Sequence, residues 1–430
     1  MRRITNSLLA ASLLVTTASA GTTAITNAHI FTGTKQGEIQ SGTIVFTNGR
    51  VTAVGERVII PKGADVIDAK GGTVTPGLYA TGSDLGAMEI DLIKSTNDNV
   101  TSSQTVSAAF DISYGINPAS MTIPVARSGG ITRALVTPNA GGGDGRELLF
   151  SGQGAIITLA DGVMSAVVKP RAAMVLELGE SGAGRAGGAR GAAIIALKAD
   201  LEDVRWFASH RRSYNDGATR ELRLSKPDLE ALVPVVRGRT RLIISVHRAS
   251  DIIEVLKLAR EHRLSIALAG AEEAWLVASD IAKARVPVLL NATTNLPGSF
   301  ESWNSTMDNA ARLDASGVTI AFLNGDGGHR ARESRYNAGN AVAHGLPYQH
   351  AIAALTSHPA AIFGDANQAG AIERGRQADI VIWSGDPLEP LTEATTVIIA
   401  GKTQPLKSRQ DELTSRYRTP GGPLPPAYRN

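Results

Sequence analysis

Four short apolar segments in the second half of the chain constrain its fold more than any other feature. They begin at Leu242, Ile266, Val286 and Val318, at intervals of 24, 20 and 32 residues. The stretches between them have helical periodicity, and residues 251–263 place apolar side chains on one face and charged side chains on the other. Apolar strands that alternate with amphipathic helices indicate a parallel sheet whose strands are buried on both faces.

The same alternation extends toward the N-terminus. Apolar segments at residues 134–136 and 173–178 fit the scheme as earlier strands. We therefore predict an α/β fold, a (β/α)8 barrel of the TIM type. In such a barrel, functional residues lie at the C-terminal ends of the strands.

Both ends of the chain favour β-strands instead. Residues 23–32 and 42–55 show this pattern, with an Asn-Gly hairpin signal inside the second, and residues 378–383 and 395–399 return to it. Strands on both sides of a barrel predict one small β-sandwich domain built from both chain ends. We place that domain at residues 21–75 and 367–407, the barrel at residues 76–366, and a polar, Pro- and Gly-rich flexible tail at residues 408–430.

The first twenty residues have the pattern of a secretory signal peptide. Arg2 and Arg3 precede an apolar stretch at residues 8–15 that is too short to span a bilayer, and Ala18-Ser19-Ala20 supplies small residues for cleavage. We expect cleavage after Ala20 and a periplasmic or secreted protein. The chain has no cysteine, which excludes disulfides, a thiolate nucleophile and a Cys-type zinc site.

Charge and composition narrow the classes of partner. Lys and Arg number 43 against 40 Asp and Glu, and removing Arg2 and Arg3 leaves 41 against 40, a net charge of +1. A net charge this small attracts nucleic acid or anionic lipid only weakly. We therefore expect neither as a partner. No later stretch is apolar enough for a membrane helix. A small-molecule substrate is the partner that the barrel predicts.

Two long segments on either side of the predicted barrel carry a family resemblance. The first is Asp-Ala-Lys-Gly-Gly-Thr-Val-Thr-Pro-Gly-Leu at residues 68–78, and the second is Gly-Ala-Ile-Glu-Arg-Gly-Arg-Gln-Ala-Asp-Ile-Val at residues 370–381. Residues 353–360, just before the second segment, and residues 152–155 add to it. Together they resemble the amidohydrolase superfamily, in its imidazolonepropionase-like branch.

The resemblance implies a metal-dependent hydrolase. Members hold one or two divalent metals, often zinc, that polarise a carbonyl group and lower the pKa of a bound water. The ligands come from His-x-His on strand 1, a carboxylated Lys or a Glu on strand 4, a His on each of strands 5 and 6, and an Asp on strand 8 that also serves as base. Residues two apart on a strand face the same side, which lets both histidines reach one ion.

This chain departs from that ligand set. The His-x-His position contains Gly82-Ser83-Asp84, and the strand 6 position is Ala269. His247 stands at the strand 5 position and Asp326 is the best match on strand 8, whereas Glu177 is one candidate for strand 4. The remaining set predicts a degenerate site in which Asp84, His247 and Asp326 hold a single divalent metal, zinc, manganese or iron.

Each of these residues also has a structural interpretation. Asp84 and Asp326 suit turns, the latter because it lies between two glycines, and the backbone can satisfy His247. His329 and His344 are lower-ranked substitutes, because isolated histidines are more often surface residues. The Gly-x-Gly-x-x-Gly at residues 182–187 is a weak dinucleotide signal, and we interpret residues 179–193 as a flexible loop over the barrel mouth.

Two functions follow from the residues and the resemblance. The first is hydrolysis of an amide, a cyclic amide or a related non-peptide C–N bond by a metal-activated water, with Asp326 as base and His247 as metal ligand or oxyanion stabiliser. The second is a non-catalytic protein on the same scaffold that binds a small ligand or pairs with an intact amidohydrolase. The sequence also leaves a homo-oligomer open.

Overall fold

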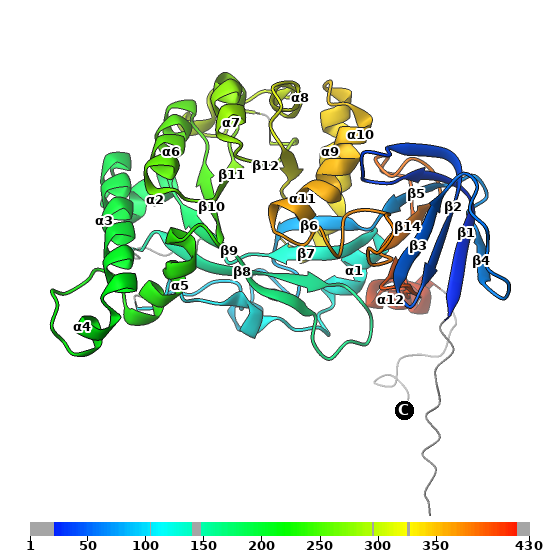
Figure 1. Ribbon diagram of the computed structural model, residues 1–430, viewed down its shortest axis with the longest axis horizontal. Coiled ribbons are helices and arrows are strands. Elements are labelled where there is room, and N and C mark those ends of the chain that lie inside the picture. The colour runs from blue at the N-terminus through cyan, green and yellow to red at the C-terminus, as the bar shows by residue number, and fades with distance from the viewer. Residues whose placement is uncertain (1–20, 104, 140–147, 295, 325–326, 419–430) are drawn as a thin grey trace, which may run out of the picture.

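Two β-structures make up the fold of this computed structural model, which describes residues 21–103, 105–139, 148–294, 296–324 and 327–418. Figure 1 shows a barrel with helices around it and a separate sheet beside it. Within the described residues the barrel wall has eight strands in sequence order. They are β6 (Leu78–Ser83), β7 (Ile131–Val136), β8 (Phe150–Thr158), β9 (Val167–Glu177), β10 (Arg241–Val246), β11 (Ile266–Gly270), β12 (Val288–Leu290) and β13 (Ile320–Phe322).

The first and last strands of the barrel meet through few contacts. Thr81 and Leu323 form a parallel bridge, and the Asn324 N–H donates to the Thr81 carbonyl at 2.9 Å. The predicted α/β barrel is therefore confirmed as a nearly closed one.

One strand runs against the predicted direction. β8 pairs antiparallel with both β7 and β9, whereas the other neighbouring barrel strands pair in parallel. Antiparallel neighbours need no crossover helix, and the described chain has none between β7 and β9. Residues 152–155, part of the family resemblance, lie inside β8.

Helices surround much of the barrel wall, and α12 lies beside the composite sheet (Figure 1). The α-helices of the described chain are α1 (Thr122–Ser128), α2 (Gly179–Arg185), α3 (Arg190–Ser209), α4 (Arg211–Asn215), α5 (Lys226–Val236), α6 (Ala249–His262), α7 (Ala278–Ala284), α8 (Asn309–Ala315), α9 (Ser334–Ala343), α10 (Tyr348–Leu355), α11 (Ser357–Ile362) and α12 (Arg409–Arg418). Among the described helices, none combines the length and apolarity needed to cross a bilayer.

The second β-structure draws strands from both chain ends, as predicted. Its strands are β1 (Thr22–Phe31), β2 (Glu38–Thr47), β3 (Arg50–Gly55), β4 (Asp65–Asp68), β5 (Thr73–Pro76), β14 (Ile380–Trp383), β15 (Ala394–Ile399) and β16 (Lys402–Thr403). They join in one mixed sheet, in the order β16-β15-β14-β5-β1-β2-β3 with β4 paired to β1. β14 and β5, far apart in sequence, pair antiparallel with Ile380 opposite Pro76.

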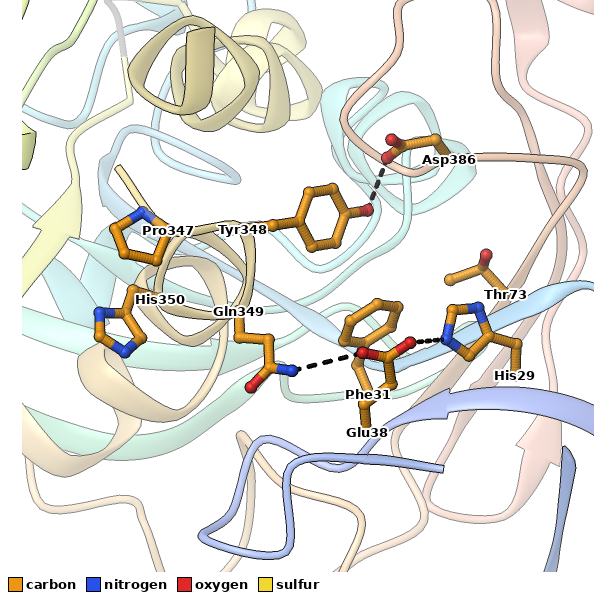
Figure 2. Close-up of a pocket in the computed structure, with 9 residues that line it drawn as sticks. All are labelled: His29, Phe31, Glu38, Thr73, Pro347, Tyr348, Gln349, His350 and Asp386. Carbon is orange, nitrogen blue, oxygen red and sulfur yellow. Dashed lines mark hydrogen bonds and ion pairs between the residues drawn. The ribbon is translucent and has the colours of Figure 1, made fainter. Parts of the chain in front are cut away.

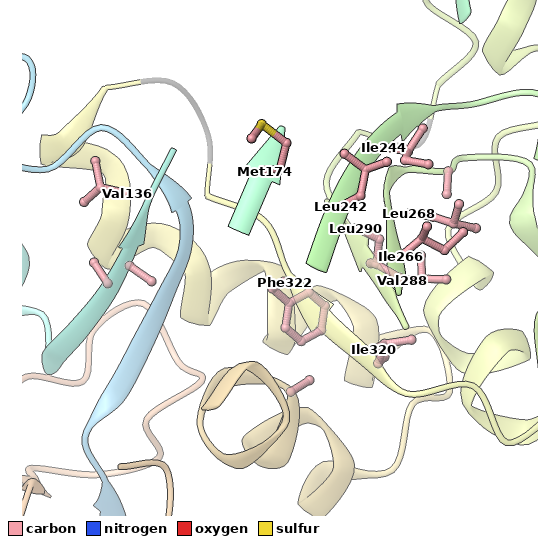
Figure 3. Packing of buried hydrophobic residues seen from close by; sticks show 14 of the residues in the cluster. Val136, Met174, Leu242, Ile244, Ile266, Leu268, Val288, Leu290, Ile320 and Phe322 are labelled. Carbon is pink, nitrogen blue, oxygen red and sulfur yellow. The ribbon is translucent and has the colours of Figure 1, made fainter. Parts of the chain in front are cut away.

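Alternate residues of the barrel strands pack into different layers. Leu242, Ile244 and their counterparts on neighbouring strands pack in the large cluster with the helices, as Figure 3 shows. Ile243 packs instead with Ala173 and Ala267 from the adjacent strands, inside the barrel. Because side chains alternate along a strand, this register directs the residue that follows β10, His247, toward the interior at the barrel mouth.

A buried ion pair joins the two β-structures. Arg133 on β7 contacts Asp379, just before β14, with 3.3 Å between Nε and Oδ2, and each residue is only 3% exposed. Asp379 also accepts from the Ala400 N–H at 2.8 Å. The aspartate in the second family-like segment thus fixes the composite sheet against the barrel.

Two expectations about irregular segments were wrong. Residues 179–193, predicted as a loop, include α2 and the start of α3, because alanine favours helix and Ala193 begins a buried stripe that continues through Leu197 and Leu201. Residues 409–418, predicted as tail, form α12 behind reciprocal hydrogen bonds between Ser408 and Asp411. Residues 1–20 and 419–430 lie outside the described part of the chain.

Candidate active site

His247 is the centre of a charged cluster at the barrel mouth. Its Nδ1 lies 2.5 Å from Glu272 Oε2, and its Nε2 lies 3.8 Å from Glu301 Oε1. The imidazole has room because the neighbouring residue on β11 is Gly270, where an added Cβ would lie 2.5 Å from the ring. The ring is thus held at one nitrogen, with its other nitrogen directed at a second carboxylate.

The surrounding charges favour the protonated form of His247. Burial lowers the pKa of the imidazole, but the bond to Glu272 and the charges of Glu272, Glu301 and Glu177 outweigh burial, and the net pKa is raised. An imidazolium at this position donates from both ring nitrogens.

Glu177 is the last residue of β9, the strand next to the one that His247 follows. It stands opposite Ser245 in the parallel β9–β10 ladder, two residues before His247. Burial raises the pKa of its carboxyl group, against the opposing charge of Arg185. The one strand 4 candidate from the sequence therefore occupies the end of the barrel strand adjacent to that of His247.

Asp84 lies buried between the ends of two barrel strands. It follows β6, is 5% exposed, and its Oδ2 accepts a hydrogen bond from the Gly327 N–H at 3.1 Å. The carboxylate therefore ties the end of β6 to the segment that follows β13. Asp326, the predicted strand 8 acid, lies outside the described residues, so its role as base and ligand stays a prediction.

The described donors do not fit a resident divalent metal. In the described ranges no three His, Asp or Glu side chains come together in a way that could hold an ion. Ala269, at the strand 6 position, packs against the barrel interior, and Gly82 has no side chain to offer. His329 and His344, the lower-ranked substitutes, are exposed.

Sequence reasoning missed two carboxylates of the cluster. Glu272 comes two residues after β11, so the rule that functional residues follow barrel strands would have found it. Glu301 lies in a short 3-10 helix, η4 (Phe300–Ser302), with no local signal, and only the folded chain brings it to His247.

A cavity also lies away from His247, between the composite sheet and α10. It measures about 540 Å³. Figure 2 shows His29 bonded to Glu38 on one side and Tyr348 Oη donating to Asp386, at 2.6 Å, on the other. None of the predicted site residues lines it.

Comparison with known proteins identifies what the chain is similar to. Residues 234–404 match the amidohydrolase family model. The curated amidohydrolase tasK of Hapsidospora irregularis is 24% identical over 390 residues, which cover 84% of this chain and 40% of that protein. The chain thus spans about 40% of the length of this relative.

Solved structures share the fold. An amidohydrolase from Thermotoga maritima MSB8 superposes with a TM-score of 0.77 at 23% identity, covering 88% of this chain and 98% of the other. Molinate hydrolase gives a TM-score of 0.56 at 15% identity, covering 90% and 95%. The barrel and the composite sheet thus have the fold of these structures, and residues 234–404 resemble the amidohydrolase family.

Proposed function

We propose that this protein is a hydrolase that cleaves an amide or cyclic amide bond at the barrel mouth, with the His247–Glu272 pair polarising the substrate carbonyl. The observation that carries the proposal is the bond between His247 Nδ1 and Glu272 Oε2, because it fixes the ring at the barrel mouth with Nε2 on the side of Glu301, 3.8 Å from Oε1. The match of residues 234–404 to the amidohydrolase family model supports the reaction type.

The chemistry requires charge stabilisation at the carbonyl oxygen. Water adds to the carbonyl carbon, the oxygen becomes negatively charged, and the C–N bond then breaks while the nitrogen takes up a proton. His247 Nε2–H donates to the developing oxyanion, and Glu272 holds the ring in place and keeps it charged. The resemblance assigns the base to Asp326.

A second candidate function is ligand binding without turnover. Gly82 and Ala269 favour it, since both lack the imidazole that active family members carry there. Export to the periplasm or beyond is also part of the proposal, on the basis of the N-terminal pattern.

Turnover by matched variants separates the two functions. The purified protein is assayed against a panel of N-acyl amino acids, cyclic imides and aryl amides. We expect His247→Gln to lower kcat by about 100-fold or more, as for loss of one oxyanion donor. His350→Gln is the control, because His350 forms an exposed pair with Asp314 at 2.8 Å. Equal rates in wild type and His247→Gln, or no turnover of any panel member, would contradict the proposal.

A further inference from the structure

The carboxylate of Glu301 is buried where carboxylates are rarely found. Its residue is 9% exposed, whereas Phe300 and Trp303 on either side are 84% and 64% exposed. Acidic side chains usually face solvent and aromatic rings usually do not. A buried charge persists only where donors compensate for the lost water, so the groups around Glu301 form a receptor for an anion.

Three donors from different elements converge on this carboxylate. Glu301 Oε2 accepts from the Glu180 N–H at 2.8 Å and from Arg190 Nη2 at 3.3 Å, and Oε1 lies 3.8 Å from His247 Nε2. Gly179 makes the space, since a Cβ there would lie 2.6 Å from Oε2. A guanidinium, a backbone N–H and an imidazole suit any carboxylate of similar size.

The receptor does not need Glu301 in order to stay assembled. Arg190 also contacts Glu180 Oε1 at 3.3 Å and Asp251 Oδ2 at 3.2 Å, so its guanidinium keeps two partners without Glu301. Gly179 and Glu180 open α2, and Arg190 opens α3, so regular structure positions the donors.

The Glu301 carboxylate also occupies the space next to the imidazole. Its Oε1 lies 3.8 Å from His247 Nε2. A substrate group that approaches Nε2 from this side must therefore take the place of that carboxylate.

We infer that the pocket formed by Arg190 and the Glu180 N–H, beside His247, is a carboxylate subsite, which Glu301 occupies as an internal ligand and which the carboxylate of the substrate takes over. The inference rests on the proposed function and sharpens it, because it specifies an amide that carries a carboxylate, such as an N-acyl amino acid. Glu301 weakens binding of such acids, because a competent site must first lose its internal occupant.

Binding of two matched probes tests the inference without requiring turnover. N-acetylglycine and its neutral counterpart N-acetylglycinamide are titrated calorimetrically into the purified wild type and Glu301→Ala. We expect Glu301→Ala to bind the acid about 10-fold more tightly than wild type, the effect of freeing one partly exposed charged contact. The affinity for the amide stays unchanged. Adding Arg190→Gln to Glu301→Ala removes the gain.

Two further variants serve as a conservative substitution and as a control. Glu301→Gln keeps the shape of the side chain and should shift acid binding in the same direction if Glu301→Ala fails to fold. Glu373→Ala removes an exposed carboxylate that pairs with Arg376 and should leave both affinities unchanged. An equal gain for acid and amide, or an acid affinity unaltered by both Glu301 variants, overturns the inference. Selective acid binding without any turnover would instead contradict the proposed function and leave the subsite standing.

Discussion

Replacing Glu272 with Gln tests the physical basis of the proposed site. The substitution keeps the size of the side chain but removes the negative charge beside His247 Nδ1. Two unit charges about 4 Å apart attract by about 4 kcal/mol at an effective dielectric constant near 20. Partial exposure, 25% for His247 and 14% for Glu272, reduces this value, and charged hydrogen bonds typically contribute about 1.5–3 kcal/mol. We therefore expect Glu272→Gln to reduce the stabilisation of protonated His247 by about 2 kcal/mol.

The sign of the pH dependence follows from the raised pKa of His247. A raised pKa in the folded protein means that the pair stabilises the fold below the ordinary histidine value of about 6.5 and that this stabilisation is lost as the pH rises through the folded pKa. Glu272→Gln should therefore lower the pH at which His247 loses its proton, with a roughly 30-fold loss of proton affinity.

The assay is a titration of the imidazole C–H resonances by nuclear magnetic resonance. His247→Gln identifies the His247 signal among the eight histidines. Asp314→Asn serves as the control, because it removes a carboxylate that contacts a different histidine, His350, and should leave the midpoint of His247 in place. A His247 midpoint that stays the same or moves to higher pH in Glu272→Gln would refute the reasoning, because the charge of Glu272 would then not hold the proton.

Two further predictions concern stability and metal content. Asp379→Asn should lower the free energy of unfolding by about 3 kcal/mol, because it removes the nearer of the two carboxylates beside the buried Arg133 and leaves only Asp365, 4.0 Å from Nε. Thermal unfolding measures this, and the exposed Glu373→Gln should change the free energy of unfolding by less than about 0.5 kcal/mol. Treatment with a chelator should leave the melting temperature and any turnover unchanged, because no three described donors could hold an ion; a stoichiometric metal whose removal abolishes turnover would contradict this.

The Arg133–Asp379 pair shows that a motif can be recognised in the sequence although the structural role of its residues depends on a distant partner. The sequence displays Ala-Asp-Ile-Val at residues 378–381, but it does not display the partner of the aspartate. Arg133 lies 246 residues earlier in the chain and meets Asp379 only when β7 and the composite sheet pack together.

Local patterns determined the barrel and the composite sheet from the sequence alone. Short, almost wholly apolar strands that alternate with helices must be buried on both faces, so residues 242–246 and 266–269 predicted β10 and β11 almost to the residue. The end of the apolar segment at residue 246 also predicted that His247 follows a barrel strand. The reversed direction of β8 escaped prediction, because strand direction depends on pairing rather than on composition.

Only the tertiary structure decided what surrounds His247. Glu272 is 25 residues away along the chain and Glu301 is 54 residues away, and each comes from a different βα connection. Their approach depends on the packing of three barrel segments, which no local periodicity encodes. The sequence therefore determined the scaffold and the position of one histidine, whereas long-range packing surrounded that histidine with two carboxylates and enclosed one of them in an anion pocket.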